Sequence, residues 1–317
     1  MTWIGIDVAK RSFTASKPGD EPARLFTMDL DGWHAFREWL PASRVRVCLE
    51  ATGPYWLQLA EWLAQAAIAY AVVNPRKVRR FAQASEQRSK TDPIDAQLVR
   101  RYAEVFSPEC TSGSEGVSRT LRVLSRRILQ LQTQLDIERD RLEKTSADPA
   151  TPDAVIASFA SITNEISRLI DELEHRAKAL VLAEPALSRD WDLLCSIPGI
   201  GPKTARTLLA EYGPRLASAS VKQLTSFAGL DVVRFESGSS VHRKPRISKQ
   251  GNWRIRRALY LAALTACRHN PTLEPYYRKK CKQGLERKQA LVAVMRKLLH
   301  IAHGVLKNQT PFQEVTA

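Results

Sequence analysis

Hydrophobic positions in the first third of the chain alternate between the period of strands and the period of helices. The pattern predicts strands over residues 3–8, 11–16, 23–29, 44–50 and 69–73. It predicts helices over residues 32–40, 54–65 and 93–106. Three strands followed by alternating helices and strands are typical of a mixed α/β sheet, which we assign to residues 1–110.

The middle of the chain repeats apolar residues in steps of three and four. The first run contains Val117, Leu121, Leu124, Ile128, Leu131, Leu135 and Leu142. After a polar break with two prolines, the second contains Val155, Phe159, Ile162, Ile166, Leu169, Leu173 and Leu180. This heptad spacing predicts a coiled-coil segment over residues 111–184, either a helical hairpin within one chain or helices paired between protomers. We expect it to act as a spacer and assembly device.

Residues 185–317 are predicted to form a helical domain, with helices over 255–267, 273–281 and 285–306. Within it, Ile197-Pro198-Gly199-Ile200-Gly201-Pro202-Lys203 resembles the hairpin of a helix-hairpin-helix module. Gly199 and Gly201 permit a tight turn, and the helix after them offers backbone N–H groups to a phosphate together with Lys203. A plain turn between two helices is the alternative interpretation.

Charge is distributed unevenly along the 317 residues. Residues 1–184 carry 25 Lys and Arg and 25 Asp and Glu, whereas residues 185–317 carry 23 and 8. The whole net charge of +15 therefore lies in the last part of the chain. Such a region favours a polyanionic partner, most simply DNA or RNA.

Other classes of protein fit the composition poorly. No apolar run approaches membrane-spanning length, and the N-terminus lacks a charged-then-apolar leader. The five cysteines have no paired spacing, which favours a reduced, cytoplasmic protein without a zinc site.

Four acids are candidates for a metal site. Asp7 lies inside an apolar strand, where a charge is costly unless it is paired or metal-bound, and Glu50 ends another strand. Asp92 and Asp95 lie three residues apart at a helix start, so they share one face. Each has an ordinary alternative: a half-exposed strand residue for Asp7, a solvated loop acid for Glu50, and helix capping for the pair Asp92 and Asp95.

Two groups of basic residues could contact a nucleic-acid backbone or form a solvated face. The first precedes the last helix of the α/β region and contains Arg76, Lys77, Arg79, Arg80 and Lys90. The second follows the Ser237-Gly238-Ser239-Ser240 segment and contains Arg243, Lys244, Arg246, Lys249, Arg254 and Arg257. Taken alone, the Ser-Gly segment predicts only a flexible loop. Tyr276 and Tyr277 could stack on bases or pack against the protein.

Several blocks together resemble one protein family. Gly5-Ile6-Asp7-Val8-Ala9-Lys10, Glu50-Ala51-Thr52-Gly53 and Lys90-Thr91-Asp92-Pro93-Ile94-Asp95-Ala96 resemble the acid blocks of DEDD-type insertion-sequence transposases, family one-ten, which includes the Piv-type invertases. Phe227-Ala228-Gly229-Leu230, Ser237-Gly238, Ile247-Ser248-Lys249-Gln250-Gly251-Asn252 and Arg257-Ala258-Leu259 resemble its second domain. Asp231-Val232-Val233 stands where members often carry a proline.

The resemblance implies a ribonuclease-H-like or RuvC-like N-terminal domain in which Asp7, Glu50, Asp92 and Asp95 hold Mg²⁺, with two ions in the site. It implies that Ser237 is the nucleophile of a DNA recombinase guided by a structured RNA. A homodimer or homotetramer acting on donor and target DNA is expected. Two alternatives remain open at this stage: a RuvC-like structure-specific nuclease that uses water, and a non-catalytic nucleic-acid-binding scaffold.

Overall fold

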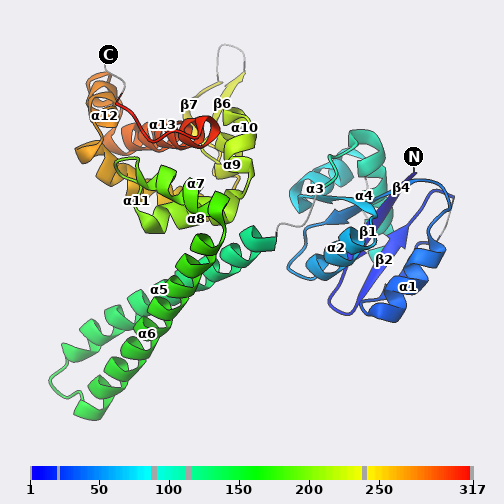
Figure 1. Ribbon diagram of the computed structural model, residues 1–317, viewed down its shortest axis with the longest axis horizontal. Coiled ribbons are helices and arrows are strands. Elements are labelled where there is room, and N and C mark those ends of the chain that lie inside the picture. Colours follow the sequence, from blue (N-terminus) through cyan, green and yellow to red (C-terminus); the bar gives the residue numbers. More distant parts are fainter. Residues whose placement is uncertain (1, 20–21, 87–90, 112–115, 238–240, 315–317) are drawn as a thin grey trace. The chain divides into compact units, whose positions relative to one another are not determined.

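The computed structural model describes residues 2–19, 22–86, 91–111, 116–237 and 241–314, without the side chains of 234–237 and 241–244. The chain divides into two compact units, Met1–Ser114 and Glu115–Ala317. The first is built on a five-stranded sheet, and the second is mainly helical (Figure 1).

The sheet of the first unit has the strand order β3-β2-β1-β4-β5. Its strands are β1 (Thr2–Val8), β2 (Ser12–Ser16), β3 (Arg24–Thr27), β4 (Val45–Glu50) and β5 (Ala69–Val73). The first three form an antiparallel meander, while β1, β4 and β5 are parallel. The helices are α1 (Leu30–Trp39), α2 (Trp56–Gln65), α3 (Pro75–Ala84) and α4 (Asp92–Phe106).

Helices cover both faces of this sheet, because alternate strand residues belong to two separate cores. Ile4 and Ile6 of β1 pack with Phe36 of α1 and Leu59 of α2. Trp3 of β1 lies in the other core, with residues of α3 and α4. The period-two alternation therefore decides which side chains lie under α4.

The mixed α/β sheet predicted from the sequence is confirmed, but one helix was missed. Residues 75–84 were expected to connect a strand to a helix, and they form α3. Asn74 caps this helix by accepting a hydrogen bond from the Arg76 nitrogen, and Pro75 occupies its first turn. Val78 anchors α3 in the core, so its basic residues lie on its exposed side.

In the second unit, α5 (Gly116–Ser146) and α6 (Asp153–Ala183) pack side by side as a hairpin (Figure 1). Leu121 and Ile128 of α5 belong to the same core as Leu208 of α8 and Leu298 of α13. The remaining helices are α7 (Pro185–Cys195), α8 (Pro202–Tyr212), α9 (Arg215–Ser218), α10 (Val221–Ala228), α11 (Trp253–His269), α12 (Leu273–Lys282) and α13 (Arg287–Asn308).

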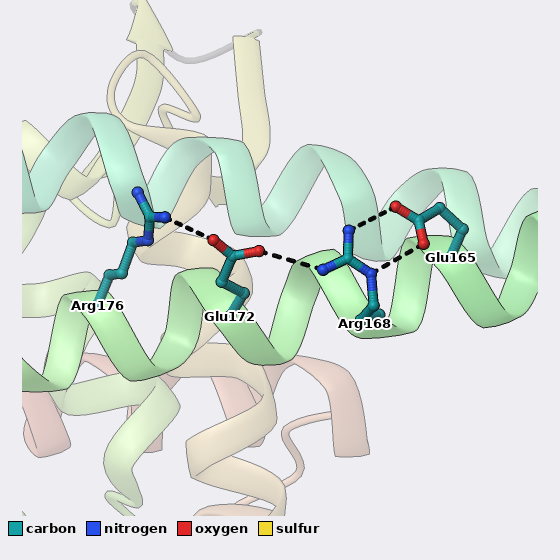
Figure 2. A network of polar contacts seen from close by, with 4 residues as sticks. All are labelled: Glu165, Arg168, Glu172 and Arg176. Atoms are coloured by element: carbon teal, nitrogen blue, oxygen red, sulfur yellow. Dashed lines mark hydrogen bonds and ion pairs between the residues drawn. The ribbon is translucent and has the colours of Figure 1, made fainter.

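The outer side of α6 carries a ladder of ion pairs (Figure 2). Arg168 donates two hydrogen bonds to Glu165, of 2.9 and 2.7 Å, and its third nitrogen lies 3.4 Å from Glu172. Glu172 also accepts a 2.6 Å hydrogen bond from Arg176. Because three- and four-residue spacings join these exposed groups along one helix, this face of α6 is neutralised locally.

The C-terminal region is not wholly helical, which corrects the expectation of an all-helical domain. Strands β6 (Val232–Ser237) and β7 (Val241–Ile247) form an antiparallel pair. Ser237, expected in a flexible loop, is the last residue of β6 and pairs with Val241. The basic run that follows was not recognised as a strand because its charged side chains hide the alternation.

Two general features of the described chain bear on its class. None of the described helices is both long and apolar enough to cross a membrane. All five cysteines are free thiols.

Candidate active site

Asp7 and Glu50 lie at one edge of the sheet and on one face. Asp7 follows Trp3 and Gly5 on the face of β1 that α4 covers, and Glu50 follows buried Cys48 on the same face of β4. The two strands are parallel neighbours with Ile6 opposite Leu49. The two carboxylates therefore leave adjacent strands side by side.

A glycine lets α4 approach this edge closely. A Cβ added at Gly5 would lie 2.7 Å from the Arg100 Cα and still closer to the Arg100 nitrogen and the Ala96 carbonyl oxygen. Real Cβ atoms do not tolerate such distances, so any side chain at Gly5 would displace α4. The first turn of this helix carries Asp92 and Asp95.

The start of α4 differs from the expected capping arrangement. Thr91 is the N-cap residue and makes no side-chain capping bond, and Asp92 is already the first helical residue. The Asp95 backbone nitrogen donates to the Thr91 carbonyl oxygen at 2.8 Å. Asp92 is exposed and Asp95 is half-buried. The alternative in which Asp92 serves as the cap is therefore wrong.

The four acids act on one another electrostatically. Burial, followed in order of strength by the negative charges of Asp95, Asp92 and Glu50, raises the pKa of the Asp7 carboxyl from 3.8 to about 6. Glu50 is held by a 2.8 Å hydrogen bond from the Thr52 hydroxyl. The charges of the other three predicted acids therefore reach Asp7, and the four residues Asp7, Glu50, Asp92 and Asp95 are called the acid cluster below.

The side chains of this acid cluster are of the type that binds hard divalent cations. Carboxylate oxygens are the ligands that Mg²⁺ prefers, and a cation would offset the repulsion that burdens Asp7. As placed, no three acid, His or Cys side chains of the described residues come close enough together to bind one ion. The carboxylate residue types and the negative charges that act on Asp7 fit a divalent metal ion.

Comparison with known proteins shows that two family models match successive parts of the chain. The DEDD transposase model of IS110 matches residues 4–145, and a model described as the transposase IS116/IS110/IS902 family matches residues 191–278. The chain is 31% identical to the pilin gene-inverting protein of Moraxella bovis over 99% of this chain and 98% of that protein. This chain belongs to the IS110/IS116/IS902 transposase family.

Other members resemble the transposase over different lengths. The pilin gene-inverting protein of Moraxella lacunata is also 31% identical, over 99% of this chain and 98% of that protein's length. An uncharacterised 43.6 kDa protein of insertion element IS110 from Streptomyces coelicolor is 29% identical over 69% of this chain and 54% of its own. The transposase is accordingly a DNA recombinase enzyme.

The basic residues of the first unit cluster on α3. Arg76, Lys77, Arg79 and Arg80 are exposed on this helix. Lys90, expected to act with them, lies outside the described residues. Four cations on one short helix offer a stripe of charge to a phosphate backbone.

The hairpin that carries Ser237 is fixed firmly at its base. The backbone nitrogens of Ser248 and Lys249 donate to the carbonyl oxygens of Asp231 and Gly229, and the Ser248 hydroxyl donates to the Asp231 carboxylate at 2.5 Å. A Cβ at Gly251 would lie 2.6 Å from the Gly229 nitrogen. Of the Ser237 position, the structure describes the backbone only.

The predicted helix-hairpin-helix glycines differ in role. Gly199 has φ +104° and lies under α11, where an added Cβ would meet the Ala266 Cβ at 2.7 Å, so it serves packing. Gly201 is the N-cap of α8 and has open space around it. Lys203 is exposed, with its Nζ 3.7 Å from Glu174. Gly201 and Lys203 keep the expected access to a phosphate.

The other basic residues predicted to bind nucleic acid lie on β7, α11 and the loop between them. The side chains of Arg243 and Lys244 are not described, whereas Arg246, Lys249 and Arg257 are exposed and Arg254 is half-buried. Tyr276 and Tyr277 pack against the core, which favours their structural interpretation.

Sequence reasoning missed a buried carboxylate in the second unit. Glu211 accepts two 2.8 Å hydrogen bonds from Arg126 and one of 2.6 Å from Asn252. Burial alone would raise the pKa of Glu211, but these hydrogen bonds and the Arg126 charge hold the pKa below its usual value. Its partners lie 85 and 41 positions away, so no local pattern indicates them.

Proposed function

We propose that the transposase cuts and rejoins DNA by metal-assisted phosphoryl transfer through a covalent bond between Ser237 and DNA. The observation that carries this proposal is the raised pKa of Asp7, a partly buried carboxyl that also lies within reach of the charges of Asp95, Asp92 and Glu50. A carboxyl whose pKa is raised by burial and by neighbouring carboxylates is typical of sites that hold cations or move protons. A carboxylate cluster kept for folding alone would be unfavourable.

In this proposal, Asp7, Glu50, Asp92 and Asp95 hold Mg²⁺, with two ions in the site as implied by the family. Bound Mg²⁺ supplies stabilisation of the negative charge that builds up on the phosphate oxygens during displacement. The cationic stripe of α3 holds the DNA backbone in register. Lys203 and the N-terminus of α8 offer a second backbone contact.

Ser237 supplies the nucleophile. Its Oγ forms a bond to phosphorus while the bond from phosphorus to one deoxyribose oxygen breaks, and the hydroxyl proton passes to a general base or to solvent. The released DNA hydroxyl carries a proton. A hydroxyl of another strand later attacks the same phosphorus and frees Ser237, so the phosphodiester linkage is conserved without external energy.

We further propose that the reaction is DNA inversion or insertion guided by a structured RNA in a homodimer or homotetramer. The full-length likeness to pilin gene-inverting proteins supports inversion as one outcome. The excess of basic residues in the last part of the chain is compatible with a bound RNA. The α5–α6 hairpin is the segment that we assign to assembly.

The test is to incubate end-labelled DNA with purified protein, its co-purified RNA and Mg²⁺, and to look for DNA attached to denatured protein. Wild type and Ser239→Ala should form the adduct, and Ser237→Ala should not. Cleavage by Ser237→Ala that leaves free DNA ends would favour a nuclease that uses water. An absence of Mg²⁺-dependent cleavage by wild type on every substrate would favour a scaffold.

A further inference from the structure

A groove in the second unit lies between α5 and the start of α11. Its volume is about 330 Å³, within the range of sites that hold small organic groups. Gln130, Thr133 and Gln134 of α5 line one wall, and Trp253 and Arg254 line the other. Every residue that lines it belongs to the second compact unit.

Trp253 is unusually placed for a tryptophan. Its side chain is 48% exposed, although it occupies the first position of α11 in a firmly anchored region. Asn252 fixes that helix start: its side chain caps the Arg254 nitrogen at 3.0 Å and donates to buried Glu211. The partly exposed Trp253 is therefore carried by an anchored helix start.

The groove has an excess of positive charge. Arg126 and Arg254 both interact with one carboxylate, that of Glu211. Burial and, to a smaller extent, the positive charge of Arg126 lower the pKa of Arg254. Within the described part of the chain, Arg127 on the same wall forms no ion pair with a carboxylate, and its Nη1 lies 3.5 Å from the Gln130 side-chain oxygen. An anion near these three guanidinium groups would reduce their repulsion.

The groove combines an aromatic face, hydrogen-bonding side chains and an excess of positive charge, which together match a nucleotide. A nucleobase stacks on an indole, its edge bonds to amides and hydroxyls, and its phosphate pairs with guanidinium groups. A duplex offers no free base face, so the occupant must be unpaired. We propose that this groove binds an unpaired nucleotide of a single-stranded segment by stacking its base on Trp253. This inference rests on the proposed action on nucleic acid.

Arg254 contributes to stacking as well as to charge. Its guanidinium lies 4.9 Å from the centre of the Trp253 ring. A base that enters on the other face of the indole would complete a three-layer stack of guanidinium, indole and base. The lateral wall of Gln130, Thr133 and Gln134 supplies both donors and acceptors, so the groove accepts more than one base.

The test measures binding of the full-length protein to labelled 12-nucleotide single strands of RNA and of DNA, and to a duplex of the same sequence. Trp253→Ala should weaken single-strand binding by about 5- to 150-fold, the range produced by loss of one stacked base, and leave duplex binding unchanged. Trp253→Phe should retain most of the affinity. Leu261→Ala, at an exposed position of the same helix, is the matched control.

The RNA and DNA arms identify which strand supplies the nucleotide, because only the true ligand loses affinity with Trp253→Ala. Photocrosslinking with 5-iodouridine or 5-iododeoxyuridine in the affected strand should yield a peptide that contains Trp253. Wild-type affinity of Trp253→Ala for both single strands overturns the groove assignment alone. A wild-type protein that binds none of the three nucleic acids overturns the proposed function itself.

Discussion

Gly5 of β1 lies directly beneath Arg100 of α4, with no room for a Cβ between the strand and the helix. This contact fixes how closely the helix that carries Asp92 and Asp95 approaches the strand that carries Asp7. Gly5→Ala should therefore destabilise the first unit by about 1–3 kcal/mol and separate the acids. Denaturant unfolding followed by tryptophan fluorescence measures the loss, with Gly304→Ala, whose added Cβ meets nothing within 4 Å, as the comparison. Equal stability of the two variants would contradict the close approach.

Asp7→Asn should make the metal-free protein more stable at pH 8. Because the pKa of Asp7 is raised from 3.8 to about 6, its ionised form opposes folding above pH 6, and this penalty disappears below pH 3.8. The gain should be about 1 kcal/mol at pH 8, since part of the group is solvated. Thermal unfolding in a chelator at pH 8 and pH 4 checks both parts. A gain that persists unchanged at pH 4 would exclude ionisation of the Asp7 carboxyl as its cause.

Glu211 should stabilise the second unit in the opposite pH range. Its pKa is lower in the folded state, so its contribution is complete above the unfolded value of 4.5 and is lost as the pH falls through the folded value. Glu211→Gln should cost about 2 kcal/mol at pH 7, because two charge-assisted hydrogen bonds from Arg126 weaken. Urea unfolding from pH 3 to pH 7 should show the two proteins converging in acid.

The exposed basic residues of α3 should bind DNA through contacts to backbone phosphates. Lys77→Gln and Arg79→Gln should each weaken duplex binding to a similar degree for all sequences and reduce the slope of log affinity against log salt by about 1. Arg168→Gln is the matched control, because Glu165 and Glu172 already neutralise that cation (Figure 2). An unchanged salt slope for the α3 variants would assign them to a solvated face.

Much of the first unit could be predicted because its cues are local. The alternation of Val45, Val47 and Leu49 placed Glu50 on the opposite face of β4, and the structure has it there. Asn74 and Pro75 are local signals for the start of α3. The basic residues after them were interpreted as a nucleic-acid contact, and the helix was not predicted. The proximity of Asp92 and Asp95 to Asp7 came from family resemblance, since no single-sequence pattern gives a distance between elements.

The second unit was less predictable because its decisive contacts are long-range. The heptads gave two helices, but they did not show that Leu121 and Ile128 share a core with α8 and α13. The Arg126–Glu211 pair joins positions 85 residues apart. The sequence around Trp253 did not predict a binding site, because the groove forms only where α5 packs against the start of α11.

Binding of Mn²⁺, a paramagnetic substitute for Mg²⁺, tests most directly whether the four acids form a metal site. Electron paramagnetic resonance titration of wild type and of Asp153→Asn, an acid at the start of α6, should show the same saturable binding. Asp7→Asn and Asp95→Asn should each weaken that binding by at least about tenfold, because a carboxylate ligand is lost. Wild-type Mn²⁺ affinity in a protein that carries both substitutions would contradict the acid cluster as the metal-binding centre.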